Sequence, residues 1–226
     1  MEDDPNRLNP LVESLIGSAF AVIDRKYGTD GLSPKGYHNR FHTSDVLNSA
    51  SYLSDLAIAK GRLDCNLKPL LLIAAAFHDI EQDLGPGNNE LASSEKAYRA
   101  MKESGIFDEE DCRIVSGAIL GTRIFFEEEI MKQSVSTESP YITQLLADAD
   151  LMSLGSNEEL YWERAIGLFN ELHPGKSSLS PEWRLFLVKQ VKLLSSHKYF
   201  TPEAEEMFIY QAENLASTER ALALVA

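Results

Sequence analysis

The sequence predicts an all-α protein, a single helical bundle of about eight to nine helices that spans residues 1–226. Apolar residues recur every three to four positions along most of the chain, which is the spacing of one helix face. Ser, Thr, Asn, Asp and Pro stand before many of these segments and glycine stands after several, as at helix ends. No segment shows sustained alternation of apolar and polar residues or an internal repeat, so strands are not expected.

The composition is that of an ordinary globular domain, with 44% hydrophobic and 25% charged residues. The longest apolar run is far shorter than the roughly 18 to 20 residues that span a bilayer, so no membrane partner is expected. The first ten residues are acidic and polar and lack the pattern of a secretory signal, which favours a cytoplasmic location. Cys65 and Cys112 share no metal-binding spacing and are expected as buried, reduced thiols.

The net charge of −14 argues against a protein that grips the phosphates of nucleic acid, because that mode of binding needs a basic face. A small phosphorylated substrate remains compatible with this charge if a metal ion reverses the local sign.

The first helix is expected from about residue 9 to 26, followed by a loop rich in Gly, Ser and Pro. The stretch YHNRFHTSDV, residues 37–46, opens the second helix. One turn back from its inward-facing Val46 lies His42, and one further turn back lies His38. Both imidazoles are therefore expected to point toward the core end of this helix.

The third helix ends in the stretch LLIAAAFHDIEQD, residues 71–83, where an apolar run stops abruptly at His78 and Asp79. Because every residue from Pro69 to Phe77 is apolar, this helix is expected to be buried all round, with the two polar residues in its last turn. A buried carboxylate costs several kcal/mol unless it has a proton, a cationic partner or a metal. Taken alone, the pair also fits a hydrogen-bonded core histidine beside a capping aspartate.

Six further helices are expected. The fourth runs from Glu90 to about Ser104 and the fifth begins in the acidic turn at 108–111. The others are expected at residues 140–154, 159–172, 182–196 and 201–224, and those from residue 157 onward are expected to pack on the region 37–155.

Two aspartates compete for the inward position of the helix at 140–154. Asp150 shares a stripe with Ile142 and Leu146, whereas Asp148 lies about 60° away from it at roughly 100° per residue. Periodicity therefore favours Asp150 as the carboxylate that faces the centre.

Three helices thus bring His42, His78, Asp79 and Asp150 toward one interior. A mixed set of two imidazoles and two carboxylates suits Mn²⁺, Fe²⁺, Co²⁺, Ni²⁺, Zn²⁺ or, less well, Mg²⁺. The expected cofactor is one or two such ions.

This H…HD…D pattern resembles the HD-domain superfamily of metal-dependent phosphohydrolases, which have an all-helical fold. In that resemblance His42 matches the first metal ligand, His78 and Asp79 the doublet, and Asp150 the last ligand. The stretch at 37–46 is also similar to the YHNxxHAxDV signature of cyclic nucleotide phosphodiesterases, in which the first histidine is the general acid. That match implies this role for His38.

A subgroup of predicted bacterial phosphohydrolases is more similar still, since it shares an NExxS helix start, here at residues 89–93, and a similar C-terminal segment. This resemblance covers roughly residues 37–220. The sequence departs from phosphodiesterases at Gln82, where they have histidine and several related nucleotidases a carboxylate. No histidine lies between Asp79 and Asp150, so a second ion would rely on Asp79 and water.

The expected activity is hydrolysis of a phosphate ester of a small metabolite, in particular a nucleotide, by metal-activated water. Asp79, Glu90 and His38 are the expected catalytic residues. Glu90 fits a solvated loop carboxylate equally well, and for Glu81 and Asp83 solvated positions are favoured.

The positive side chains expected to bind the substrate are Arg40 and those of the basic segment 182–198, in particular Lys189 and Lys192. The outer face of a helix is the alternative for these lysines, and His173 and His197 are expected at packing or surface positions.

Two alternative functions remain, phosphodiesterase-like activity and a non-hydrolytic nucleotide sensor. The oligomeric state is left open.

Overall fold

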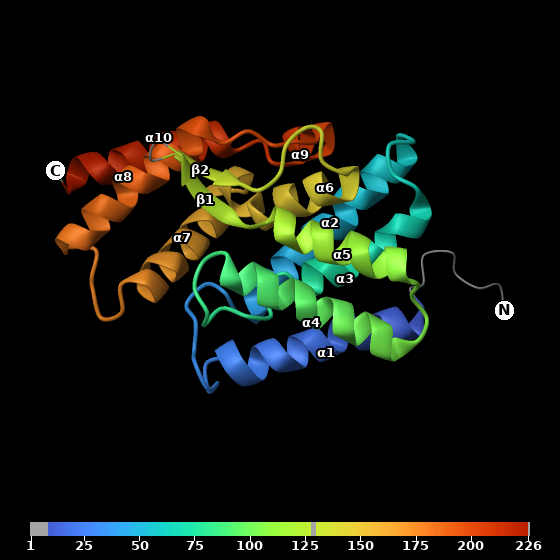
Figure 1. Ribbon diagram of the computed structural model, residues 1–226. Helices are drawn as coiled ribbons and strands as arrows, with labels where there is room; N and C mark the ends of the chain where they lie inside the picture. The colour runs from blue at the N-terminus through green and yellow to red at the C-terminus, as the bar shows by residue number, and fades with distance from the viewer. Residues whose placement is uncertain (1–8, 128–129, 226) are drawn as a thin grey trace.

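The computed structural model describes residues 9–127 and 130–225, and it confirms the all-α class (Figure 1). The acidic stretch 1–8 lies outside the described residues. The α-helices in the described ranges are α1 Pro10–Tyr27, α2 Arg40–Ala59, α3 Lys68–Phe77, α4 Asn88–Ser104, α5 Glu109–Gly121, α6 Tyr141–Asp150, α7 Glu158–Leu172, α8 Pro181–Ser196, α9 Pro202–Met207 and α10 Gln211–Leu224. Two short 3₁₀ helices, η1 Cys65–Leu67 and η2 Met152–Gly155, and two strands, β1 Ile124–Glu127 and β2 Ile130–Gln133, complete the described elements.

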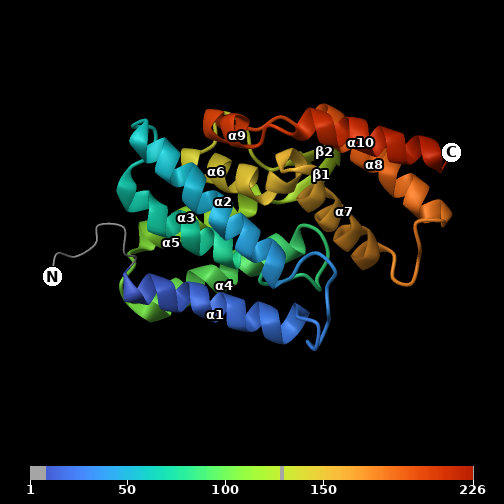
Figure 2. The same cartoon turned by 180° about the vertical axis from the view of Figure 1, so that it is seen from behind.

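Helix α3 lies at the centre of the larger half of the molecule (Figures 1 and 2). Every residue from Leu70 to Phe77 is buried, and α1, α2, α4, α5 and α6 all pack against this helix. The expected all-round burial of α3 is confirmed. The helix ends at Phe77, however, so His78 is its C-cap and Asp79 follows in the turn rather than in the last helical turn.

A second, smaller hydrophobic core joins η2, α7, α8 and the C-terminal helix α10. Its centre is aromatic, with the rings of Phe169, Trp183 and Phe186 in mutual contact. The first core contains the helices before residue 150 together with α9. The polar site described below lies where elements of the two cores meet, because its cluster comes from α2, the turn after α3 and α6, and its cavity wall includes residues of α7 and α8.

The expectation of no strands is wrong for the segment between α5 and α6. Residues 124–127 and 130–133 form an antiparallel hairpin in which Ile124 pairs with Gln133 and Glu127 with Ile130. Each strand has only four residues, too few for an alternating pattern to stand out. Of the acidic triplet 127–129, Glu127 ends β1 and is exposed, and the other two residues lie outside the described residues.

The last expected helix, 201–224, is divided into α9 and α10 by a turn at 208–210. This turn packs on Gly155, where an added Cβ would lie 2.3 Å from the carbonyl oxygen of Phe208. The Tyr210 amide also donates to the Gly155 carbonyl, at 3.1 Å. The break is therefore imposed by a tertiary contact, which helical periodicity does not reveal.

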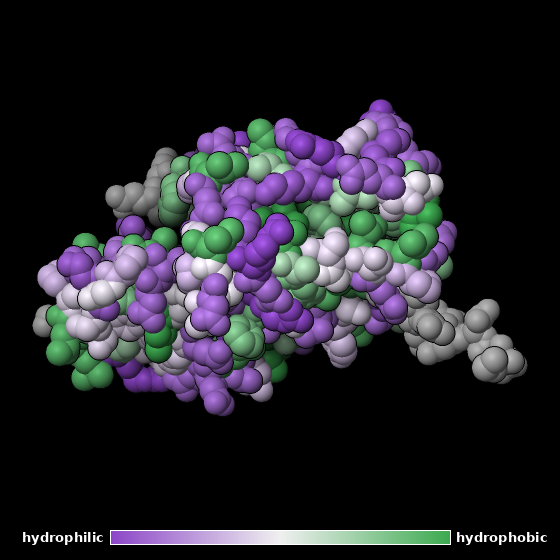
Figure 3. Space-filling model, turned by 90° about the horizontal axis from the view of Figure 1, so that it is seen from below, coloured by the Kyte–Doolittle hydropathy of each residue, from purple (hydrophilic) through white to green (hydrophobic). Residues whose placement is uncertain are grey.

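The large apolar side chains that reach the surface are scattered over many elements. Figure 3 shows one face, on which hydrophilic side chains predominate and smaller hydrophobic patches lie between them. Such scattered exposure is normal for globular domains. Among the described residues, no helix combines the length and apolar character needed to cross a membrane.

Glu81 is buried rather than solvated, contrary to expectation. Its carboxylate accepts hydrogen bonds from Lys26 Nζ at 2.8 Å, the Tyr27 hydroxyl at 3.0 Å and Lys96 Nζ at 2.5 Å. Burial alone would raise the pKa of Glu81, but these donors outweigh it and lower the pKa to about 2. Glu81 therefore joins α1, α4 and the loop that follows the His78 turn.

The Glu81→Gln chain is expected to lose about 2 kcal/mol of unfolding free energy at pH 7, because charge-assisted hydrogen bonds are lost. A lowered pKa stabilises the fold above the ordinary carboxyl pKa and ceases to do so as the pH falls through the folded value. The difference from the wild type should therefore shrink between about pH 4.5 and about pH 2. Urea denaturation at several pH values measures it. Glu95→Gln, in an exposed pair with Arg99, is the control and should change stability by less than about 0.5 kcal/mol.

Candidate metal centre

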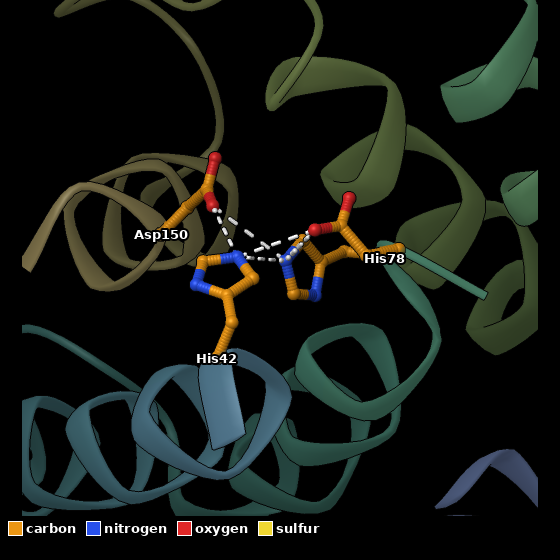
Figure 4. Close-up of side chains that lie close together, drawn as sticks. His42, His78 and Asp150 are labelled. Carbon is orange, nitrogen blue, oxygen red and sulfur yellow. Dashed lines mark hydrogen bonds and ion pairs between the residues drawn. The ribbon is translucent and has the colours of Figure 1, made fainter. Parts of the chain in front are cut away.

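Side chains from three separate segments meet in one buried cluster (Figure 4). His42 lies in the first turn of α2, on the same face as the fully buried Val46 one turn later. His78 and Asp79 follow α3, and Asp150 is the last residue of α6. One ligand atom from each of these four residues lies within 4.8 Å of all the others, so the predicted convergence is confirmed.

The tautomer of neutral His78 follows from its surroundings. Its Nδ1 lies 2.8 Å from the Ala75 carbonyl oxygen, which can only accept a hydrogen bond, so Nδ1 carries a proton. In the neutral ring the lone pair is then on Nε2, which faces the cluster. A backbone carbonyl that orients a histidine in this way is typical of metal sites.

Each carboxylate has one oxygen directed to the centre and one bound elsewhere. Gln82 Nε2 donates to Asp79 Oδ1 at 2.7 Å, and Gln133 Nε2 donates to Asp150 Oδ2 at 3.3 Å. The other oxygens, Asp79 Oδ2 and Asp150 Oδ1, face the imidazoles. Gln82, to which the sequence assigned no role, thus orients the carboxylate of Asp79.

Distances between the inward-facing atoms fit a single divalent ion. His42 Nε2 lies 3.2 Å from His78 Nε2, 3.2 Å from Asp79 Oδ2 and 3.3 Å from Asp150 Oδ1. From His78 Nε2, the same two oxygens lie at 3.2 and 3.5 Å. Ligands about 2.1 Å from one ion are about 3.0 Å apart at a right angle and about 3.4 Å apart at a tetrahedral angle. This cluster can therefore hold a metal ion.

Without a bound ion, the two imidazoles and the two carboxylates of the cluster must balance each other's charges. Burial opposes the charged form of all four groups, but the carboxylates raise the pKa of His42 and of His78 above the ordinary range. In return the imidazoles lower the pKa of Asp79 and of Asp150. The site is therefore organised around a positive charge, which protons or a cation supply.

Asp148 is not part of this cluster. Its side chain is fully buried and accepts hydrogen bonds from the Phe200 amide at 2.8 Å, the Thr201 amide at 2.8 Å and Thr201 Oγ1 at 2.7 Å. The preference for Asp150 as the inward carboxylate is confirmed. Asp148 holds the turn that precedes α9.

A cavity of about 160 Å³ adjoins the cluster, and Asp79 and Asp150 lie in its wall. Apolar side chains from the hairpin, η2, α7 and α8 form most of the remaining wall: Ile124, Met131, Leu151, Leu154, Ala165, Leu168 and Leu193. Among the described residues, Arg164 is the only lysine or arginine that lines this cavity.

His38 lies in the loop before α2, because Asn39 caps the helix and α2 begins at Arg40. Its ring is 5.8 Å from that of His42, as expected for neighbours one turn apart. His38 Nδ1 lies 2.6 Å from Glu171 Oε1, and the amides of Tyr37 and His38 donate to Glu171 Oε2. His38 also lines the cavity, so its ring is fixed at the edge of the site.

Glu171 of α7 remains ionised in this arrangement. Burial would raise its pKa, but the His38 ring and the two backbone amides lower the pKa of Glu171 to about 2. A stable carboxylate therefore holds the proton on His38 Nδ1 and leaves Nε2 as the nitrogen that can serve the cavity.

The expected substrate-binding residues, Arg40, Lys189 and Lys192, do not line the cavity. Arg40 is more than half exposed and pairs with Asp24 of α1. It stands two residues from His42, so about 200° of helical rotation separates the two side chains. On α8, Lys189 and Lys192 lie on the exposed face, as in the alternative given for them, whereas Gln190 and Leu193 line the cavity.

The loop carboxylates differ in their positions. Glu90 lines the cavity, and its Oε2 also accepts a hydrogen bond from the Gly87 amide at 2.7 Å, which caps α4. Its catalytic role stays a prediction. Asp83 binds Lys35 and Ser33 at the surface. His173 packs on Phe169, and His197 on Tyr199, as expected for packing histidines.

Three residues of α7 and α8 were missed from the sequence: Arg164 and Gln190, which line the cavity, and Glu171, which binds His38. Arg164 of α7 donates from Nε to Asp45 Oδ2 at 2.6 Å, and Glu171 lies two turns further along the same helix. Gln190 of α8 is buried, and the structure records no hydrogen bond from its side chain to another described residue. The one available signal was that Arg164 and Glu171, seven residues apart, share a face of their helix.

Comparison with known protein families finds no family that matches this chain, and comparison with curated proteins finds no match. The function is therefore inferred from the chemistry of the site.

Proposed function

We propose that this protein is a metal-dependent phosphohydrolase of the HD-domain type, which cleaves the phosphate ester of a small metabolite, in particular a nucleotide. The observation that carries this proposal is the convergence of His42, His78, Asp79 and Asp150 beside a cavity. A divalent ion held by these residues supplies Lewis-acid stabilisation of the phosphate and activation of water.

His38 serves as the general acid in this proposal. Glu171 binds its Nδ1–H and thereby keeps the protonated ring oriented, with Nε2–H available to the leaving oxygen of the ester. The backbone amides of Tyr37 and His38 hold Glu171 itself in place. A proton donated at this atom neutralises the alkoxide as the ester bond breaks.

Arg164 is the proposed partner of the substrate phosphate. Asp45 engages its Nε and Glu163 its Nη1, so the guanidinium is fixed in the cavity wall before a substrate arrives. A preorganised guanidinium can form paired hydrogen bonds with phosphate oxygens. In this proposal Arg164, and not Arg40, Lys189 or Lys192, binds the substrate phosphate.

The organic part of the substrate is proposed to occupy the apolar side of the cavity. Leu154, Leu168 and Leu193 offer contact area there, and Gln190 offers one neutral donor and one neutral acceptor. Because Arg164 is the only lysine or arginine among the described residues of the cavity wall, the cavity suits a monophosphate better than a polyphosphate.

A panel of phosphate monoesters, cyclic nucleotides and nucleoside triphosphates, assayed with Mn²⁺, Co²⁺ or Mg²⁺, tests the proposal. We expect turnover of monoesters. Arg164→Gln should raise KM about 10- to 100-fold, equivalent to about 1.4 to 2.8 kcal/mol, and keep the metal. Arg40→Gln is the matched control and should leave KM unchanged. Turnover of cyclic nucleotides alone would indicate a phosphodiesterase, and nucleotide binding without turnover would indicate a sensor.

A further inference from the structure

We propose that the centre takes a single metal ion, and that Gln82 sets this limit by holding its amide N–H group where a second cation would need to bind Asp79. The inference rests on the metal centre of the proposed function, but not on hydrolysis or on any substrate. It concerns the outer oxygen of Asp79, which lies on the side of the carboxylate away from the two imidazoles.

A chain of hydrogen bonds with one possible direction fixes the Gln82 amide. The Leu84 backbone N–H can only donate, and it donates to Asn89 Oδ1 at 2.9 Å. The Nδ2 of Asn89 therefore faces Gln82 and donates to Gln82 Oε1 at 3.2 Å. Gln82 must then present its own Nε2–H to Asp79 Oδ1, at 2.7 Å.

This chain is also held in place from outside. Asn89 is buried within the start of α4, and the Gln82 backbone amide donates to the Tyr27 hydroxyl at 2.7 Å. The Gln82 side chain cannot reverse its amide without breaking the bond to Asn89 and placing two oxygens against each other. The donor therefore stays against Asp79 Oδ1.

The consequence for metal binding follows from charge. A carboxylate bridges two cations by giving one oxygen to each, but here an N–H group with partial positive charge covers the outer oxygen of Asp79. Gln133 covers the outer oxygen of Asp150 in the same way. Each aspartate thus has one oxygen for the ion, and within the described ranges no further His, Cys, Asp or Glu joins this cluster.

Gln82→Glu tests this inference directly, because the introduced carboxylate removes the donor and adds a ligand beside Asp79. Mn²⁺ binding is measured by equilibrium dialysis with elemental analysis, and by electron paramagnetic resonance, in the absence of substrate. We expect one ion per wild-type chain with the spectrum of an isolated Mn²⁺, and two ions per Gln82→Glu chain with the broadened spectrum of a coupled pair.

Asn89→Asp is the second variant, since its introduced carboxylate accepts from Gln82 and turns the amide oxygen toward Asp79. It should also gain ion binding, whereas Asn88→Asp adds the same charge at an exposed neighbouring position and should stay at one ion. Far-UV circular dichroism checks that each chain is folded. Two ions on the wild type, none on the wild type, or one ion on both folded Gln82→Glu and Asn89→Asp would overturn the inference. A lack of phosphatase activity would overturn only the proposed hydrolysis.

Discussion

The His78→Ala chain is expected to retain no divalent ion after dialysis, whereas the wild type retains its ion. His78 provides one of four ligand atoms, and its Nε2 lies 3.2 Å from both His42 Nε2 and Asp79 Oδ2, so its removal opens the centre of the cluster. Loss of a residue that merely supports a ligand costs about 10- to 100-fold in affinity, and loss of the ligand itself should cost more. Elemental analysis measures the result, with His173→Ala as the control.

Paired aspartate variants sharpen this expectation. Asp150→Asn should lower metal affinity by more than about 100-fold, because it replaces a ligand carboxylate by a neutral amide. Asp148→Asn should keep the ion but lower the unfolding free energy by about 1 to 3 kcal/mol, since an amide cannot accept all the bonds from Phe200 and Thr201. The reverse order of metal affinities would overturn the assignment of Asp150, and full metal content in His78→Ala would overturn the site.

The His38→Ala chain is expected to keep its metal and to lose activity in a way that depends on the leaving group. Protonation of an alkoxide by a general acid contributes about 10²- to 10⁴-fold, so an alkyl phosphate should suffer a loss in this range. Nitrophenyl phosphate has a leaving group that needs little protonation and should lose far less. The comparison of kcat values on the two substrates measures this difference.

Glu171→Gln separates positioning from proton transfer. This variant keeps the shape of the side chain but weakens the hold on His38 Nδ1, so it should show the same preference for the better leaving group, at a smaller loss. Equal losses on both substrates for His38→Ala would show that this residue only supports the loop before α2. A normal rate for both variants on the alkyl phosphate would exclude the general-acid role.

Local sequence patterns determined much of the fold and the cluster. Helical periodicity placed His42 on the inner face of α2 and separated Asp150 from Asp148, because residues one turn apart share a face of a helix. The unbroken apolar run before His78 predicted a buried helix, and that helix is α3. The same periodicity should have excluded Arg40, which is two residues from His42 and so faces away from it.

Tertiary packing alone decided the rest. Arg164 and Gln190 in the cavity wall, and Glu171 beside His38, come from helices of the second core. No local pattern tells which residues of another core will face a given site. The direction of the Gln82 amide depends on a hydrogen-bond chain through a residue seven positions away. Helix periods are set by bonds between near neighbours, whereas such contacts depend on how separate helices pack, and only the folded chain contains that information.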